Sequence, residues 1–240
     1  MFNAGSRYLT RIQSLSIPNA SGMHLAAYLL PFEINDFQFD DFAREQIACP
    51  ATILRSVRKR QAEYFFGRLV ARAALQGAGI ERWEVDIGDS GEPIWPSSVA
   101  GSITHSDSFA AALVTTRARY PFVGVDIENV VSDEEDFALR NIVFDQHEIA
   151  LLQRASRPFE LRHLMTIAFS AKESLFKALF PRTHVRFGFD AVSLVEFDAP
   201  SHRLRFALAA DLALRLPERS TFDLTFQWLA PTVVFTSLVA

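Results

Sequence analysis

The sequence has a single cysteine and no long apolar run, and each absence excludes a class of protein. One cysteine in 240 residues, Cys49, excludes a disulfide framework within the chain and fits a reducing compartment. No run approaches the roughly 18 consecutive apolar residues of a membrane-spanning helix. Arg7 and Arg11 precede the apolar stretch HLAAYLLPF, but the acidic EINDFQFDD follows at once, so no signal peptide is expected. We therefore expect a cytoplasmic protein that is not bound to a membrane.

The chain also lacks an excess of positive charge. Its 24 Lys and Arg residues are outnumbered by 28 Asp and Glu residues, which gives a net charge of −4 and argues against a nucleic-acid-binding protein. No block of like charges or low-complexity tract indicates disorder. Because 49% of the residues are hydrophobic, the chain can bury a sizeable core as one large domain or two small ones.

Three stretches have the apolar spacing of helices. The pattern predicts one long helix over 52–76, helical structure over 133–157 and a helix over 169–181 that stops at its proline. Within the second stretch, Asp145 is a predicted N-cap, because Glu148 follows three residues later and completes a capping box.

Short or alternating apolar runs predict the strands, and Gly and Pro residues place a loop or hairpin turn at 88–98. The predicted strands are 22–32, 101–106, 110–116, 122–128, 191–197, 203–209, 221–229 and 232–240. The order strand, long helix, strands is thus followed by helices, long helix, strands. We expect an α+β fold with a break in the stretch 116–122, which gives domains at 1–120 and 121–240.

The stretch FVGVDIE places two carboxylates on one face of a strand. Successive side chains of a strand point to opposite faces, so Asp126 and Glu128 project together, about 7 Å apart. Carboxylates and water are usual ligands of Mg²⁺, and Gly124 beside the pair is expected to leave open floor next to them. The alternative is a half-buried strand with a wet acidic face.

The stretch FSAKESLFKALFP carries a third carboxylate and an amine. On a helix, Glu173 and Lys177 lie one turn apart and project together, while phenylalanines on the other positions anchor the helix. These side chains could complete the metal site. The alternative is a surface ion pair worth about 0.3 to 0.5 kcal/mol.

Two further stretches suit phosphate binding. GSITHS, residues 101–106, offers backbone N–H groups, the hydroxyl of Thr104 and the imidazole of His105. RKRQAEYFFGR places Arg60 and Arg68 among the basic residues of the first long helix. The alternatives are a structural or exposed histidine and a solvated helix face.

The ordered set KRQAEYFFGR, GDSGEPIWP, GSITHS, VGVDIE and FSAKESLFKALFP resembles the 4′-phosphopantetheinyl transferases of the surfactin and enterobactin synthetase type. The resemblance spans roughly residues 55–190. It implies a two-half α+β fold with pseudo-twofold symmetry, with the active site in the cleft between the halves. It also implies a monomeric transferase that moves the phosphopantetheine arm of coenzyme A onto a serine of an apo acyl or peptidyl carrier protein. Magnesium would be needed, and adenosine 3′,5′-bisphosphate would be released.

The resemblance also implies roles for single residues. Asp126, Glu128 and Glu173 would bind the metal, and Lys177 would lie by the phosphates. Because the serine hydroxyl must lose its proton, Glu173 is also the candidate base, either directly or through a metal-held water. Coenzyme A would be bound by Arg60, Arg68, Thr104, His105 and Lys172, with His105 at the 3′-phosphate.

One position departs from the pattern, and one rival function is left open. Relatives often carry a basic residue before the GEP turn, where this chain has Ser90. The rival is a coenzyme A or nucleotide-binding module without transfer activity, although three carboxylates around one cation argue against it. The carrier protein, from siderophore, polyketide or lipid synthesis, is not identified by any motif.

Overall fold

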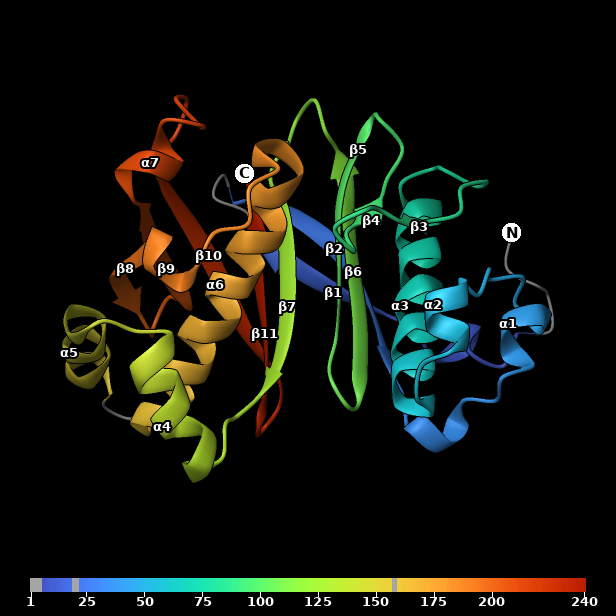
Figure 1. The fold of residues 1–240 in the computed structure, drawn as a ribbon, viewed down its shortest axis with the longest axis horizontal. Coiled ribbons are helices and arrows are strands. Elements are labelled where there is room, and N and C mark those ends of the chain that lie inside the picture. The colour runs from blue at the N-terminus through green and yellow to red at the C-terminus, as the bar shows by residue number, and fades with distance from the viewer. Residues whose placement is uncertain (1–5, 19–21, 157–158) are drawn as a thin grey trace. The chain divides into compact units, whose positions relative to one another are not determined.

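The computed structural model describes residues 6–18, 22–156 and 159–240, which fold into two compact units. Unit 1 comprises the residues up to Ile17 with His24–Pro121, and unit 2 comprises Phe122–Ala240 with Pro18–Met23. Each unit packs one long helix against a β-sheet (Figure 1). The predicted α+β class with two similar halves is thereby confirmed. No helix in the described ranges is long and apolar enough to cross a membrane.

Unit 1 contains a four-stranded sheet in the order β1-β2-β6-β5 and a separate hairpin of β3 and β4. Its strands are β1 (Gln13–Pro18), β2 (His24–Pro31), β3 (Asp86–Ile87), β4 (Pro93–Ile94), β5 (Val99–His105) and β6 (Phe109–Thr116). Its helices are η1 (Leu9–Arg11), η2 (Ile34–Asp36), α1 (Asp41–Arg44), α2 (Ala51–Leu54) and α3 (Arg58–Gly77). The β3–β4 hairpin confirms the turn predicted from the Gly and Pro residues.

The helix predicted over 52–76 is wrong as one continuous element, because the structure divides it into α2 and α3. The chain is extended at Val57. Gln61 Nε2 donates hydrogen bonds to the carbonyls of Ile53, Leu54 and Ser56, which satisfies the acceptors left at the end of α2. Apolar periodicity alone did not reveal this side-chain cap.

Helix α3 lies against strands β2, β5 and β6 through its apolar stripe. Phe65, Phe66 and Leu69 are fully buried in the core of unit 1. A Cβ atom at Gly67 would lie 3.2 Å from Ile103 Cγ2, so the absence of a side chain there lets α3 approach β5 closely.

Unit 2 contains a five-stranded antiparallel sheet in the order β7-β11-β10-β9-β8. Its strands are β7 (Val123–Asn129), β8 (Val192–Asp198), β9 (Arg203–Leu208), β10 (Thr221–Ala230) and β11 (Val233–Val239). Its helices are α4 (Asp133–Ile142), α5 (Gln146–Ala155), α6 (Leu161–Thr183), η3 (Phe189–Ala191) and α7 (Ala210–Ala213). Helix α6, orange in Figure 1, packs against β7, β10 and β11.

The predicted helix boundaries in unit 2 are partly confirmed. Asp145 caps α5 by accepting from the Glu148 backbone N–H, and the Glu148 side chain accepts in return from the Asp145 N–H. Residue 157, the predicted end of this region, lies outside the described residues. The stop predicted at Pro181 is wrong, because α6 continues to Thr183 before His184 adopts a left-handed conformation. The proline lies in the last turn, so its missing N–H removes one helical hydrogen bond, to the carbonyl of Lys177, and only two helical residues follow it.

Candidate active site

Strand β7 and helix α6 form the carboxylate cluster of unit 2, defined by Asp126, Glu128, Glu173 and Lys177. The two elements are in direct contact because Gly124 has no side chain, and a Cβ atom there would clash with the backbone oxygen of Ser174. The predicted open floor at Gly124 is therefore wrong, since the helix backbone fills that space.

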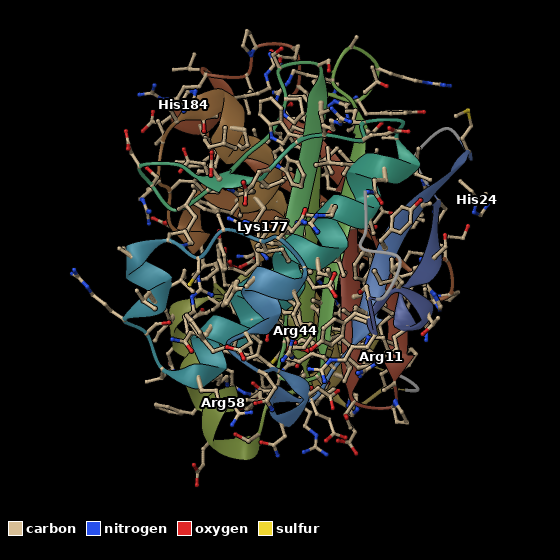
Figure 2. The ribbon with its side chains drawn as sticks, turned by 90° about the vertical axis from the view of Figure 1, so that its right-hand side faces the viewer. Arg11, His24, Arg44, Arg58, Lys177 and His184 are labelled. Carbon is tan, nitrogen blue, oxygen red and sulfur yellow. The ribbon has the colours of Figure 1, made fainter. Side chains whose placement is uncertain are left out.

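Asp126 is held by side chains on α6. Asp126 is only 4% exposed, so the strand does not present a wet acidic face at this position. Ser170 Oγ donates to Asp126 Oδ2 over 2.8 Å. Lys177, labelled in Figure 2, donates from its Nζ to Asp126 Oδ1 over 2.6 Å. Lys177 thus pairs across to the strand, which argues against an exposed pair with Glu173 on the same helix.

Behind Asp126 lies a buried hydroxyl network that the sequence did not reveal. Thr236 Oγ1, on β11, lies 2.9 Å from Ser170 Oγ and 2.8 Å from Ser174 Oγ. All three residues are fully or almost fully buried. Such a network limits the rotation of Ser170, and therefore of the Asp126 carboxylate that it contacts. Ser170 and Ser174 occur four residues apart in an apolar helix, and this spacing was the available signal.

The ionised forms of the other two carboxylates, Glu128 and Glu173, are destabilised. Burial, with repulsion from Asp126 and Glu173, raises the pKa of Glu128 to about 8, although Lys177 opposes this shift. Burial and repulsion from Asp126 also raise the pKa of Glu173, again opposed by Lys177. With all three carboxylates ionised, the cluster would carry more negative charge than its one ammonium group balances.

The donor set suits a divalent cation. Carboxylate oxygens are the ligands that Mg²⁺ prefers, and an added cation would relieve the repulsion that raises the two pKa values. Across the described ranges, however, no group of three or more His, Cys, Asp or Glu side chains is arranged so that it could hold a metal ion. The ligand atoms of the cluster are therefore of the type that Mg²⁺ prefers, but the ammonium group of Lys177 contacts an Asp126 oxygen that could also bind a cation.

Phenylalanines anchor α6 as predicted, and Glu173 lies at their edge. Phe169 packs against the core of unit 2, Phe180 is buried, and the ring of Phe176 stacks on that of Phe180 with centroids 5.6 Å apart. Glu173 also lines a cavity of about 190 Å³ with Phe176 and Phe187.

Lys172 is buried in an ion pair of its own. Its Nζ lies 2.8 Å from Glu148 Oε1 and donates to the carbonyls of Val143 and Phe189. Glu148 in turn accepts from the backbone N–H of Leu194 over 2.7 Å. Burial lowers the pKa of the Lys172 ammonium, and the hydrogen bond to Glu148 opposes this shift. The contacts join α6 to α5 and β8, while the predicted contact of Lys172 with coenzyme A stays a prediction.

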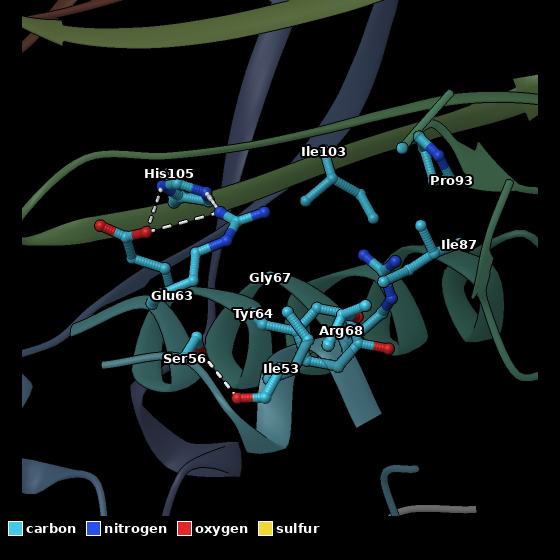
Figure 3. A pocket seen from close by; sticks show the side chains of 13 residues that line it. Ile53, Ser56, Glu63, Tyr64, Gly67, Arg68, Ile87, Pro93, Ile103 and His105 are labelled. Atoms are coloured by element: carbon cyan, nitrogen blue, oxygen red, sulfur yellow. Dashed lines mark hydrogen bonds and ion pairs between the residues drawn. The ribbon is translucent and has the colours of Figure 1, made fainter. Parts of the chain in front are cut away.

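Unit 1 contains a cavity of about 390 Å³ that brings together three of the predicted residues. Arg60 and Arg68 line it from α3, and His105 lines it from the end of β5. Figure 3 shows Arg68 and His105 in this lining. Thr104 is not among the residues that line it, because its neighbours Ile103 and His105 take the cavity-facing positions of the strand. Its predicted role stays a prediction.

The charges of this cavity favour an anion. Helix α3 has no acidic residue in its first turn but begins with Arg58, Lys59 and Arg60. The N-terminal end of a helix carries partial positive charge, which repels these cationic side chains. An anion bound there would be attracted both by the helix dipole and by the side chains. Arg68 stacks over the Tyr64 ring at 4.4 Å, and burial lowers the pKa of its guanidinium. Within the described chain, Arg68 Nε is buried without a hydrogen-bond acceptor, and a bound anion could supply one.

The hairpin loop closes one side of the cavity. Gly91 and Pro93 line it, and Gly91 takes a φ of +89° that favours glycine. The backbone N–H of Ser90 donates to Glu92 Oε2 over 3.0 Å, which holds the turn. The position where relatives often carry a basic residue therefore adjoins the cavity lining.

The chain is similar in sequence to known 4′-phosphopantetheinyl transferases. Residues 49–115 match the 4′-phosphopantetheinyl transferase N-terminal domain family, and residues 122–226 match the 4′-phosphopantetheinyl transferase superfamily. The chain is 39% identical to enterobactin synthase component D of Salmonella typhi over 173 residues, covering 71% of this chain and 70% of that protein. It is 32% identical to the 4′-phosphopantetheinyl transferase Svp of Streptomyces mobaraensis over 188 residues, 75% of each chain. It is 36% identical to the 4′-phosphopantetheinyl transferase PptT of Mycobacterium tuberculosis over 158 residues, 64% of this chain and 66% of the other.

Proposed function

The chain belongs to the 4′-phosphopantetheinyl transferase superfamily, and we propose that it transfers the 4′-phosphopantetheine arm of coenzyme A to a serine of an apo carrier protein. The observation that carries the proposal is the carboxylate cluster of Asp126, Glu128 and Glu173, whose charge Lys177 only partly balances. Binding of coenzyme A alone would not require three carboxylates, so the cluster favours transfer over the rival function of a ligand-binding module.

Coenzyme A binds, in this proposal, with its nucleotide phosphates at the cavity of unit 1. Arg60 and Arg68 contact these phosphates, and His105 contacts the 3′-phosphate. The buried Arg68 Nε supports this assignment, because it gains an acceptor when an anion binds. Contacts distant from the reacting phosphate use binding energy to hold the pyrophosphate in line for attack.

Asp126, Glu128 and Glu173 would hold Mg²⁺, which supplies electrostatic stabilisation to the charge on the transferring phosphate. Lys177 lies by the same phosphates and adds a positive charge. Glu173 accepts the proton of the carrier serine, whose oxygen forms a bond to the β-phosphorus of coenzyme A. The bond from that phosphorus to the bridging oxygen breaks, and adenosine 3′,5′-bisphosphate leaves.

The test is mass spectrometry of apo carrier proteins from siderophore, polyketide and lipid synthesis after incubation with the enzyme, coenzyme A and Mg²⁺. Addition of one phosphopantetheine group, with release of adenosine 3′,5′-bisphosphate, supports the proposal. Tight binding of coenzyme A without modification of any carrier would instead support the ligand-binding module. Omission of Mg²⁺ tests the metal requirement, and light scattering tests the predicted monomer.

A further inference from the structure

Glu63 is a carboxylate in the cavity of unit 1 that the proposed reaction does not use. It lies on α3, three residues after Arg60, and its side chain is only 12% exposed. A negative charge in a cavity that binds phosphates repels the ligand. Its presence there is explained if it acts on the neighbouring cations.

Three side chains from two elements form a closed triangle at this position (Figure 3). Glu63 Oε2 lies 3.5 Å from Arg60 Nη1 and 3.9 Å from His105 Nδ1. Arg60 Nη1 also lies 3.1 Å from His105 Nε2. Glu63 is therefore close to both Arg60 and His105, and these two side chains are close to each other.

The contact with Arg60 determines which nitrogen of His105 carries its proton. A guanidinium only donates hydrogen bonds, so Nε2 must accept from Arg60 and the neutral ring is protonated at Nδ1. Nδ1 is the nitrogen that faces Glu63. For Nε2 to donate to a phosphate instead, both ring nitrogens must carry protons, and the Glu63 carboxylate that faces Nδ1 stabilises that imidazolium form.

We infer that Glu63 is a positioning residue that makes the cavity selective for a phosphomonoester, by holding Arg60 and His105 side by side as donors to one group. The inference rests on the proposed binding of coenzyme A. A phosphomonoester carries between one and two negative charges and three terminal oxygens at neutral pH, so it accepts from both donors. The hydroxyl that replaces it in dephospho-coenzyme A does not need such a pair. The titratable side chains that line the cavity with Glu63 are Arg60, Tyr64, Arg68 and His105.

Calorimetric titration of coenzyme A and of dephospho-coenzyme A tests this selectivity. Glu63→Gln keeps the size of the side chain but removes its charge. We expect it to weaken coenzyme A binding about 10-fold, by analogy with the loss of carboxylates that orient histidine ligands, and to change dephospho-coenzyme A binding less than 2-fold. In a His105→Ala background the same substitution should have a smaller effect, because one of its two partners is gone.

Asp107→Asn is the matched control. It removes one negative charge two residues from His105, from an exposed pair with Lys59 that lies outside the cavity lining. It should leave the preference for coenzyme A unchanged. Equal weakening of both ligands by Glu63→Gln, or an unchanged or larger preference for coenzyme A, overturns the inference. If the wild-type protein binds neither ligand, the proposed function fails as well. If the wild-type protein binds coenzyme A and the Glu63→Gln variant still prefers coenzyme A to the same degree, only the inference about Glu63 fails.

Discussion

Units 1 and 2 use the same building plan but leave opposite charges uncompensated. In unit 1, α3 directs Arg60 and Arg68 to a cavity, and a buried guanidinium nitrogen there lacks an acceptor. In unit 2, α6 and β7 gather three carboxylates around one lysine, and two of these carboxylates have raised pKa values. Unit 1 therefore favours an anion, and unit 2 favours a cation.

This difference shows that the scaffold and the chemistry are specified by different residues. Both long helices are held by fully buried apolar side chains, such as Phe65 and Leu69 in α3 and Leu175 and Leu179 in α6. The apolar stripe determines where each helix packs. The polar residues at its edge determine which ligand the unit attracts.

If unit 2 performs the chemistry, Glu173→Gln should have the largest effect on turnover. The variant keeps the size of the side chain but removes its charge and basicity. We expect turnover to fall about 10²- to 10⁴-fold at saturating coenzyme A, the range for loss of a general base. Mass spectrometry of the carrier protein across a Mg²⁺ titration measures this loss, with circular dichroism to check the fold.

The matched control is Glu160→Gln, at the exposed N-terminal end of the same helix. It should leave turnover unchanged. A wild-type rate for Glu173→Gln would show that Glu173 is neither metal ligand nor base.

The two lysines of α6 sharpen the comparison further, because the structure gives them different partners. Lys172→Met leaves the buried Glu148 without its ion-pair partner, so the free energy of unfolding should fall by about 3 to 5 kcal/mol. Urea denaturation measures this, with the exposed Lys59→Met as a control that should cost at most about 1 kcal/mol. Unchanged stability together with weaker coenzyme A binding would support the contact predicted from the sequence instead.

Lys177→Ala should affect turnover and leave metal binding intact. We expect turnover to fall about 10²- to 10³-fold, as for loss of one preorganised group that stabilises charge. Because Lys177 competes with a cation for Asp126, Mg²⁺ should bind the variant at least as tightly as the wild type. Calorimetry with Mg²⁺ alone checks this, and weaker Mg²⁺ binding would show that Lys177 supports the metal site.

The carboxylate cluster should also make stability depend on pH. The pKa of Glu128 is about 8 in the folded protein, above the ordinary value near 4.5, so the folded state binds the proton more tightly than the unfolded state. Without divalent cations, the Tm should therefore fall as the pH rises from about 4.5 to 8. Glu128→Gln should flatten this dependence, and Mg²⁺ should raise the wild-type Tm more at pH 8 than at pH 6. A wild-type Tm that is constant over this range in EDTA would contradict the assignment.

The smallest expected effect is in unit 1, at the hairpin loop. Ser90→Lys places a positive charge beside the cavity, which should tighten coenzyme A binding by at most about 1 kcal/mol. Ser97→Lys, also exposed but outside the cavity lining, is the control. Unchanged or weaker binding by calorimetry for Ser90→Lys would show that another residue already provides that contact.

Local patterns predicted the elements, and long-range contacts decided the exceptions. The capping box at Asp145 was predictable because both of its partners are close in sequence. The break before α3 was not, because it depends on Gln61 capping an earlier helix. Gly124 was predicted to leave open space, but space beside a strand depends on what packs there.

The sequence by itself determined the α+β class, the two halves and the residue types that can bind phosphates and a cation. These follow from periodicity, and from motifs within single elements. Only the tertiary structure decided which charges meet. It paired Lys177 with Asp126, buried Lys172 against Glu148, and placed Glu63 beside His105. Partners separated by 24 to 51 residues lie at distances that no local pattern encodes, because packing between elements brings them together.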